Sequence, residues 1–102
     1  MPRFPLDIPA GLSETAGAVV SAGNKTLALF SVGGEIHAID NVCPHRGGPL
    51  GEGHLEGSVV RCPFHSWTFD VKTGECVGRP GIGVPRYAVL QEGGRHWVEI
   101  PD

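Results

Sequence analysis

The sequence predicts an all-β protein, built as a small antiparallel β-sandwich or barrel. Two observations lead to this class. The chain has 102 residues, the size of one domain, and contains 16 glycines and 9 prolines, so turns are frequent. Its apolar residues occur in short runs that are rich in β-branched and aromatic side chains, which is typical of strands. Residues 9–16 are the nearest helical candidate, and they are too few to stand alone as a helix.

The predicted strands follow one another in hairpins. Residues 25–32 alternate, with Leu27 and Leu29 on one face, and Gly33-Gly34 joins them to the next strand as a two-residue turn. Gly93-Gly94 lies in a similar turn near the end of the chain. The predicted strands are residues 17–21, 25–32, 35–39, 58–61, 66–71, 86–91 and 95–100.

Charge and hydropathy exclude several classes of partner. The net charge is −3 and there is no basic run, so nucleic acids and acidic membrane surfaces are poor partners. No apolar stretch reaches the roughly 18 residues that cross a bilayer. Residues 1–5 lack the apolar core of a signal peptide, so we expect a cytoplasmic protein. Three cysteines do not make a disulfide framework.

Residues 41–83 differ from the strands around them, because they are rich in Cys, His, Gly and Pro. Cys43-Pro44-His45 is followed, after a gap of sixteen residues, by Cys62-Pro63-Phe64-His65. Each motif offers one thiolate and one imidazole, and both groups bind borderline-soft metals. The candidate ligands are therefore Cys43, His45, Cys62 and His65. His54 is the spare histidine between the motifs.

The metal is either zinc or a two-iron cluster. Zinc motifs more often pair Cys with Cys in one motif and His with His in the other. The mixed motifs suit a bridged cluster, in which one iron takes both cysteines and the other takes both histidines. The sequence therefore favours the cluster and leaves a structural zinc module as an alternative.

The pattern C-x-H, a gap of about sixteen residues, then C-x-x-H resembles the signature of Rieske iron–sulfur proteins. The resemblance spans the chain and is most specific over residues 43–67. It implies one 2Fe–2S cluster per chain, held by Cys43, His45, Cys62 and His65. It also implies the Rieske fold, a single domain over residues 1–102 with a basal antiparallel β-sandwich and a small cluster-binding subdomain at about 41–83. Residues 78–81 would form a third loop near the cluster.

The chain differs from the high-potential Rieske proteins of cytochrome bc complexes at four positions. Those proteins have a disulfide between the two cluster loops, where this sequence has Gly48 and Phe64. They also have a serine and a tyrosine hydroxyl that hydrogen-bond the cluster sulfurs, where this sequence has Trp67 and Phe69. Such bonds raise the potential, so we expect a low-potential cluster, near about −150 mV.

The resemblance is therefore to the soluble Rieske ferredoxins of aromatic-ring-hydroxylating dioxygenase systems, which act in aromatic hydrocarbon catabolism. It implies a monomeric one-electron carrier between a flavin-dependent NAD(P)H reductase and a terminal oxygenase. The chain would not be an enzyme, since 102 residues leave no room for the oxygenase's non-haem iron domain. Its docking face would surround His45 and His65. The small subunit of assimilatory nitrite reductase is an alternative.

Overall fold

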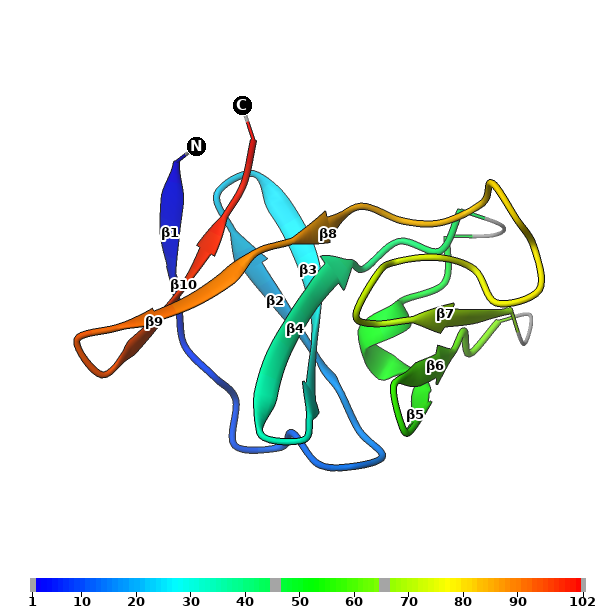
Figure 1. Cartoon of the computed structure of the whole chain (residues 1–102), viewed down its shortest axis with the longest axis horizontal. Helices are drawn as coiled ribbons and strands as arrows, with labels where there is room; N and C mark the ends of the chain where they lie inside the picture. Colours follow the sequence, from blue (N-terminus) through cyan, green and yellow to red (C-terminus); the bar gives the residue numbers. More distant parts are fainter. Residues whose placement is uncertain (1, 45–46, 65–66, 102) are drawn as a thin grey trace.

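The fold consists of short antiparallel strands in three sheets (Figure 1). The computed structural model describes residues 2–44, 47–64 and 67–101. The first sheet has the order β1 (Arg3–Leu6), β10 (Arg95–Glu99), β9 (Val89–Glu92). The second has the order β2 (Ala18–Ala22), β3 (Lys25–Val32), β4 (Glu35–Asp40), β8 (Arg86–Tyr87). The third has the order β5 (His54–Glu56), β6 (Val59–Arg61), β7 (Thr68–Asp70). The all-β prediction is confirmed.

Helical structure in the described ranges is limited to one 3-10 turn, η1 (Leu50–Glu52), and no helix there is long and apolar enough to cross a membrane. The weak helical candidate at residues 9–16 is not a helix. The Ser13 hydroxyl accepts hydrogen bonds from the backbone N–H groups of Thr15 and Ala16, which holds this segment in a turn.

The predicted strand at residues 86–91 is divided into two strands. β8 pairs with β4 in the second sheet, whereas β9 pairs with β10 in the first. The chain therefore passes from one sheet to the other near Ala88 (Figure 1). The carbonyl of Ala88 still accepts a hydrogen bond from the N–H of Glu99, so the crossing stays tied to β10.

Strand β3 is buried on both faces. Leu27 and Leu29 pack into a core between the first and second sheets, while Ala28 and Phe30 face the other way. We call the first the basal core, formed by Leu6, Ala22, Leu27, Leu29, Ala38, Tyr87, Val98 and Ile100. The second is the loop core, formed by Ala28, Phe30, Ile39, Cys43, Leu50, Leu55, Val60, Cys62, Phe69, Val71, Cys76 and Val84.

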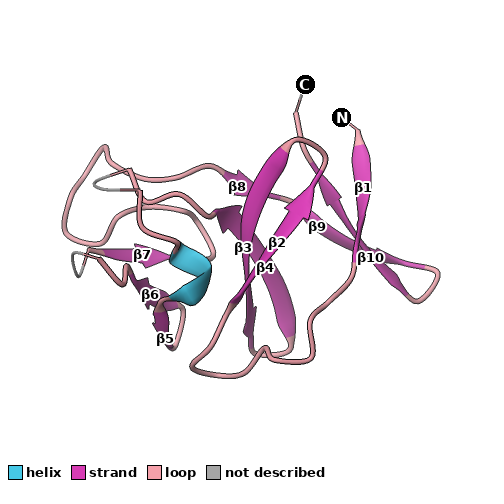
Figure 2. Cartoon of the chain, turned by 180° about the vertical axis from the view of Figure 1, so that it is seen from behind, coloured by secondary structure: helices cyan, strands magenta, loops and turns pink. Residues whose placement is uncertain are grey.

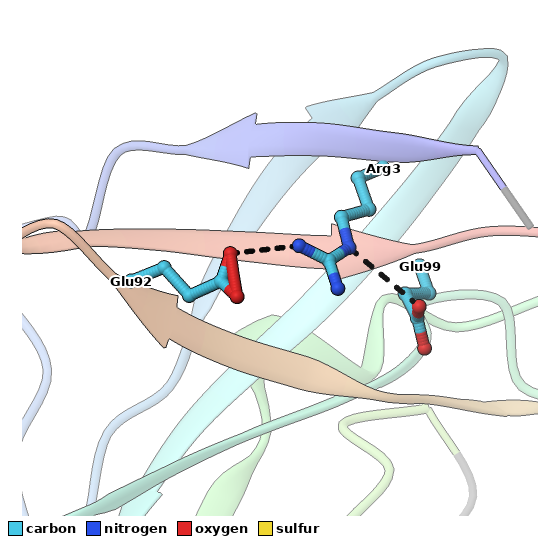
Figure 3. Close-up of polar contacts among 3 residues, drawn as sticks. All are labelled: Arg3, Glu92 and Glu99. Carbon is cyan, nitrogen blue, oxygen red and sulfur yellow. Dashed lines mark hydrogen bonds and ion pairs between the residues drawn. The ribbon is translucent and has the colours of Figure 1, made fainter.

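Strand β1 was not predicted from the sequence. It pairs with β10 in antiparallel register, from Arg3 opposite Glu99 to Leu6 opposite His96. The Arg3 guanidinium also lies 2.8 Å from the Glu92 carboxylate and 3.7 Å from that of Glu99 (Figure 3). These exposed ion pairs contribute little free energy, and the backbone ladder and the burial of Leu6 hold the strand in place.

Candidate metal centre

Three loops meet at one end of the molecule, away from the two chain termini (Figures 1 and 2). Loop 1 comprises residues 41–49, between β4 and η1, and loop 2 comprises residues 62–67, between β6 and β7. Loop 3 comprises residues 76–82, where the N–H of Cys76 bonds the carbonyl of Ile82 at 2.9 Å. The two sequence motifs lie in loops 1 and 2.

Loop 1 is fixed at both ends by one buried residue. The Asn41 side-chain oxygen accepts a hydrogen bond from the N–H of Gly51 at 2.8 Å, and its backbone carbonyl accepts one from Leu50 at 2.8 Å. Within the loop, the N–H of Cys43 bonds the carbonyl of Gly48, and the N–H of Gly47 bonds the carbonyl of Cys43. Gly47 has φ +73°, a backbone conformation that favours glycine. The Cys43 backbone is thereby held in one conformation.

Loop 2 is a tight connection. The N–H of Cys62 bonds the carbonyl of Trp67 at 2.8 Å, which closes the loop across its base. β6 and β7 pair directly before and after it, with Arg61 opposite Thr68. The pairing of β6 with β7 therefore fixes the positions of the two ends of loop 2.

The two cysteine side chains of the motifs are buried in the loop core. Cys43 and Cys62 are each 1% exposed, and no disulfide joins cysteines in the described part of the chain. Loops 1 and 2 also touch, because a Cβ atom placed on Gly48 would lie 2.6 Å from the Sγ of Cys62. Two thiols from adjoining loops, shielded from water, fit a cofactor that takes thiolate ligands.

The two histidines of the motifs, His45 and His65, lie outside the described residues, as does Arg46. Within the described ranges, no three His, Cys, Asp or Glu residues gather as a metal site. The spare histidine, His54, is exposed on β5, opposite Arg61 and outside the three loops. Cys76 is buried in the loop core.

Gly48 and Phe64 face each other across loops 1 and 2. A Cβ on Gly48 would lie 3.3 Å from the Cβ of Phe64, close to the roughly 3.5–4.5 Å between the Cβ atoms of a disulfide. These are the positions at which high-potential Rieske proteins would have their cross-link. In this chain a glycine and a 59% exposed phenylalanine occupy them instead.

Loop 3 contacts loop 2 through a pair of side chains that the sequence did not predict. The guanidinium carbon of Arg79 lies 4.2 Å from the centre of the Trp67 ring, which is cation–π geometry. The base of loop 3 is attached to β7 by the bond from the N–H of Val77 to the carbonyl of Thr68. The sequence shows a basic residue in a loop rich in Gly and Pro, but only the fold identifies Trp67 as its partner.

The chain matches the model of the Rieske [2Fe-2S] domain family over residues 5–88. It belongs to that family. It is 38% identical, over 92% of its length and 88% of the relative's, to the ferredoxin component of the naphthalene 1,2-dioxygenase system of Pseudomonas aeruginosa. The 2Fe–2S cofactor follows from the family, so the zinc alternative is wrong. The chain is an electron-transfer component and not a catalytic enzyme.

Solved structures show the same fold. The Sphingomonas yanoikuyae B1 ferredoxin is 30% identical, with TM-score 0.79, over 98% of this chain and 100% of that one. A chain from the complex of reduced oxygenase and oxidized ferredoxin in carbazole 1,9a-dioxygenase is 28% identical, with TM-score 0.80, over 93% of this chain and 99% of that one. The predicted Rieske fold is therefore confirmed.

Proposed function

We propose that this protein is a low-potential one-electron carrier, which takes electrons from a flavin-dependent NAD(P)H reductase and delivers them to a terminal ring-hydroxylating oxygenase. The observation that carries the proposal is the burial of Cys43 and Cys62 in adjoining loops of a Rieske domain. When bound, the 2Fe–2S cluster supplies the one-electron chemistry. The protein's residues hold it, shield it and present it to partners.

The proposed ligands are Cys43, His45, Cys62 and His65. The cysteines come from the ends of loops 1 and 2 that enter the loop core, while each histidine stands nearer the tip of its loop in the sequence. Thiolates gain from burial near backbone N–H groups, and neutral imidazoles tolerate water. This division supports a docking face around the two histidines.

The proposed docking face extends from the histidines over residues at the tips of the loops. Electron transfer requires two redox centres to come close, and such transient interfaces are small, below about 1,200 Å². The floor of the face would be Pro44, Arg46, Gly47, Phe64, Trp67 and Pro80.

The proposed domain is the whole chain, residues 1–102, with a cluster-binding subdomain at about 41–83. A hydrogen bond of 2.9 Å from the N–H of Asp40 to the carbonyl of Pro85 supports these bounds. The chain leaves β4 and returns to β8 at adjacent points, so the segment between them is an insertion into the sandwich. The protein would act as a cytoplasmic monomer.

The low potential is supported by the side chains near the proposed ligands. Phe69 is fully buried in the loop core that contains Cys43 and Cys62, and it carries no hydroxyl. Trp67 also lacks a hydroxyl that would donate to sulfur. With fewer donors, the negative charge added on reduction is less stabilised.

Reconstitution with separate partners tests the function. The loaded protein is reduced by a flavin-dependent reductase and NADH, separated from both, then mixed with an oxidised naphthalene dioxygenase-type oxygenase and frozen at intervals for EPR. We expect one equivalent of electrons to pass per chain, seen as growth of the reduced oxygenase's EPR signal and loss of the reduced carrier's, each identified from the spectrum of that protein alone. A reduced protein that leaves the oxygenase oxidised would contradict the proposal, whereas failure with the reductase alone would contradict only the reductase assignment.

A further inference from the structure

Acidic residues are absent from the sequence of the three loops. Residues 41–49, 62–67 and 76–82 contain none of the chain's 11 Asp and Glu residues, although the net charge is −3. Their charged residues are Arg46 and Arg79. The three loops thus carry only basic residues in a chain of negative net charge, and this asymmetry favours one orientation of approach to a partner.

Arg79 is held in place by Trp67. Its guanidinium carbon lies over the indole ring, 4.2 Å from the ring centre, and the guanidinium carries five N–H donors. Asp70 and Glu75 line the same hollow as Arg79, yet neither forms an ion pair with it among the described residues. The stack reduces the entropy that the side chain loses on binding, and its donors remain available for a carboxylate.

Exposed apolar side chains lie in the same three loops as Arg79. The described residues include five exposed large hydrophobic side chains, and four of them lie in the three loops. They are Val42 (53% exposed), Phe64 (59%), Val77 (51%) and Ile82 (40%). Exposed apolar side chains gathered at one end, with an arginine and a tryptophan among them, are characteristic of binding surfaces.

We propose that Arg79, held over Trp67, is the charged anchor of the docking face, and that the terminal oxygenase meets it with a carboxylate beside an apolar surface. This inference rests on the proposed function and adds the chemistry of the partner. The exposed apolar side chains of the three loops contribute contact area, and the Arg79–carboxylate pair fixes the orientation of the two proteins. Association therefore weakens as ionic strength rises.

The chain offers a matched control for Arg79. Arg95 lies over the Trp97 ring at 5.5 Å, on β10 in the first sheet. The two arginines carry the same charge and a similar stack, but Arg95 is outside the three loops. Arg79→Glu and Arg95→Glu therefore make the same change in net charge at two ends of the molecule.

The test measures binding of the cluster-loaded protein to a purified naphthalene dioxygenase-type oxygenase, by calorimetry at low and high salt. We expect Arg79→Glu to raise Kd by about tenfold or more at low salt, and Arg95→Glu to leave it within about twofold. We expect Arg79→Lys, which keeps the charge, to retain the salt dependence. The visible spectrum and the potential of each variant show that the cluster is unchanged.

Two results overturn the inference. If wild type binds and Arg79→Glu binds equally well, or if Arg95→Glu weakens binding as much, Arg79 is not the anchor, although the electron-carrier function stands. If wild type neither binds nor reduces the oxygenase at any salt concentration, the proposed function fails and this inference fails with it.

Discussion

Gly48 in loop 1 lies directly against Cys62 in loop 2. A Cβ on Gly48 would be 2.6 Å from the Cys62 Sγ and 3.1 Å from the Phe64 ring, both too close for an ordinary contact. A side chain at residue 48 would therefore force loop 1 or the Cys62 side chain to shift from the positions seen here.

Gly48→Ala should lower the cluster content of the purified protein. The added methyl group must displace a proposed ligand atom, and overpacking of this kind costs about 1–3 kcal/mol. Iron and acid-labile sulfide per chain measure the effect. Gly11→Ala is the control, since a Cβ there meets nothing within 4 Å. Full cluster content in Gly48→Ala would show that loop 1 moves freely relative to Cys62.

Cys43→Ser and Cys62→Ser should each abolish the cluster, and His45→Ala and His65→Ala should lose or alter it. Each of these four side chains is a proposed ligand of the cluster, and no other residue is proposed to replace it. Visible absorption, EPR of the reduced protein, and iron and sulfide analyses check this. Cys76→Ala is the control, because Cys76 is buried in the same core and is not a proposed ligand. If Cys76→Ala lost the cluster while the four ligand variants kept it, the proposed ligand set would be wrong and Cys76 would be a ligand.

The wild-type potential should lie near about −150 mV, and Phe69→Tyr should raise it. A hydrogen bond to a charged group contributes about 1.5–3 kcal/mol, and a one-electron couple shifts by about 59 mV for each factor of ten. We therefore expect a rise of about 60 mV or more by voltammetry. Phe4→Tyr adds the same hydroxyl on β1, beside the basal core, and should leave the potential unchanged. Equal potentials for wild type and Phe69→Tyr would mean that residue 69 does not reach a cluster sulfur.

His37 should make stability depend on pH. Its Nε2 is buried without a hydrogen-bond partner among the described residues. Burial lowers its pKa below the usual 6.5; Lys72 and Arg86 add to this, whereas Glu35 and Asp70 oppose it. The unfolded state therefore binds the proton more readily, so stability is greatest above about pH 6.5 and falls as pH drops below it.

His37→Leu removes the imidazole that takes up this proton. Urea unfolding of wild type and His37→Leu at intervals from pH 7.5 to pH 5.5 measures the difference, and the variant should lose less stability on acidification. His54→Gln, at an exposed position on β5, is the control. Parallel curves for wild type and His37→Leu would show that burial of His37 does not govern the acid sensitivity.

The sequence predicted the features that depend on local pattern. β3, the Gly33-Gly34 turn and β4 are adjacent in the chain, so alternation and turn chemistry sufficed to place them. β1 was missed because its partner β10 lies about ninety residues away and because proline and arginine weaken its strand pattern.

Features that depend on tertiary contacts were not predictable. The break between β8 and β9 follows from pairing with two different sheets, and no residue in the run marks it. Likewise, the contact of Arg79 with Trp67 joins two loops whose relative position only the fold determines. The four candidate ligands were predicted from their spacing, which is a chemical signature and does not require knowledge of the fold.

Because both faces of β3 are buried, the cluster-binding segment cannot be separated cleanly from the sandwich. Phe30 and Ala28 form part of the loop core but belong to the sandwich strand, as does Ile39 on β4. A fragment comprising residues 41–83 would leave these three side chains and Val84 behind and expose the apolar surface that they cover. Residues 41–83 therefore cannot be moved to another protein by themselves, and a host would have to supply apolar side chains in place of these four residues.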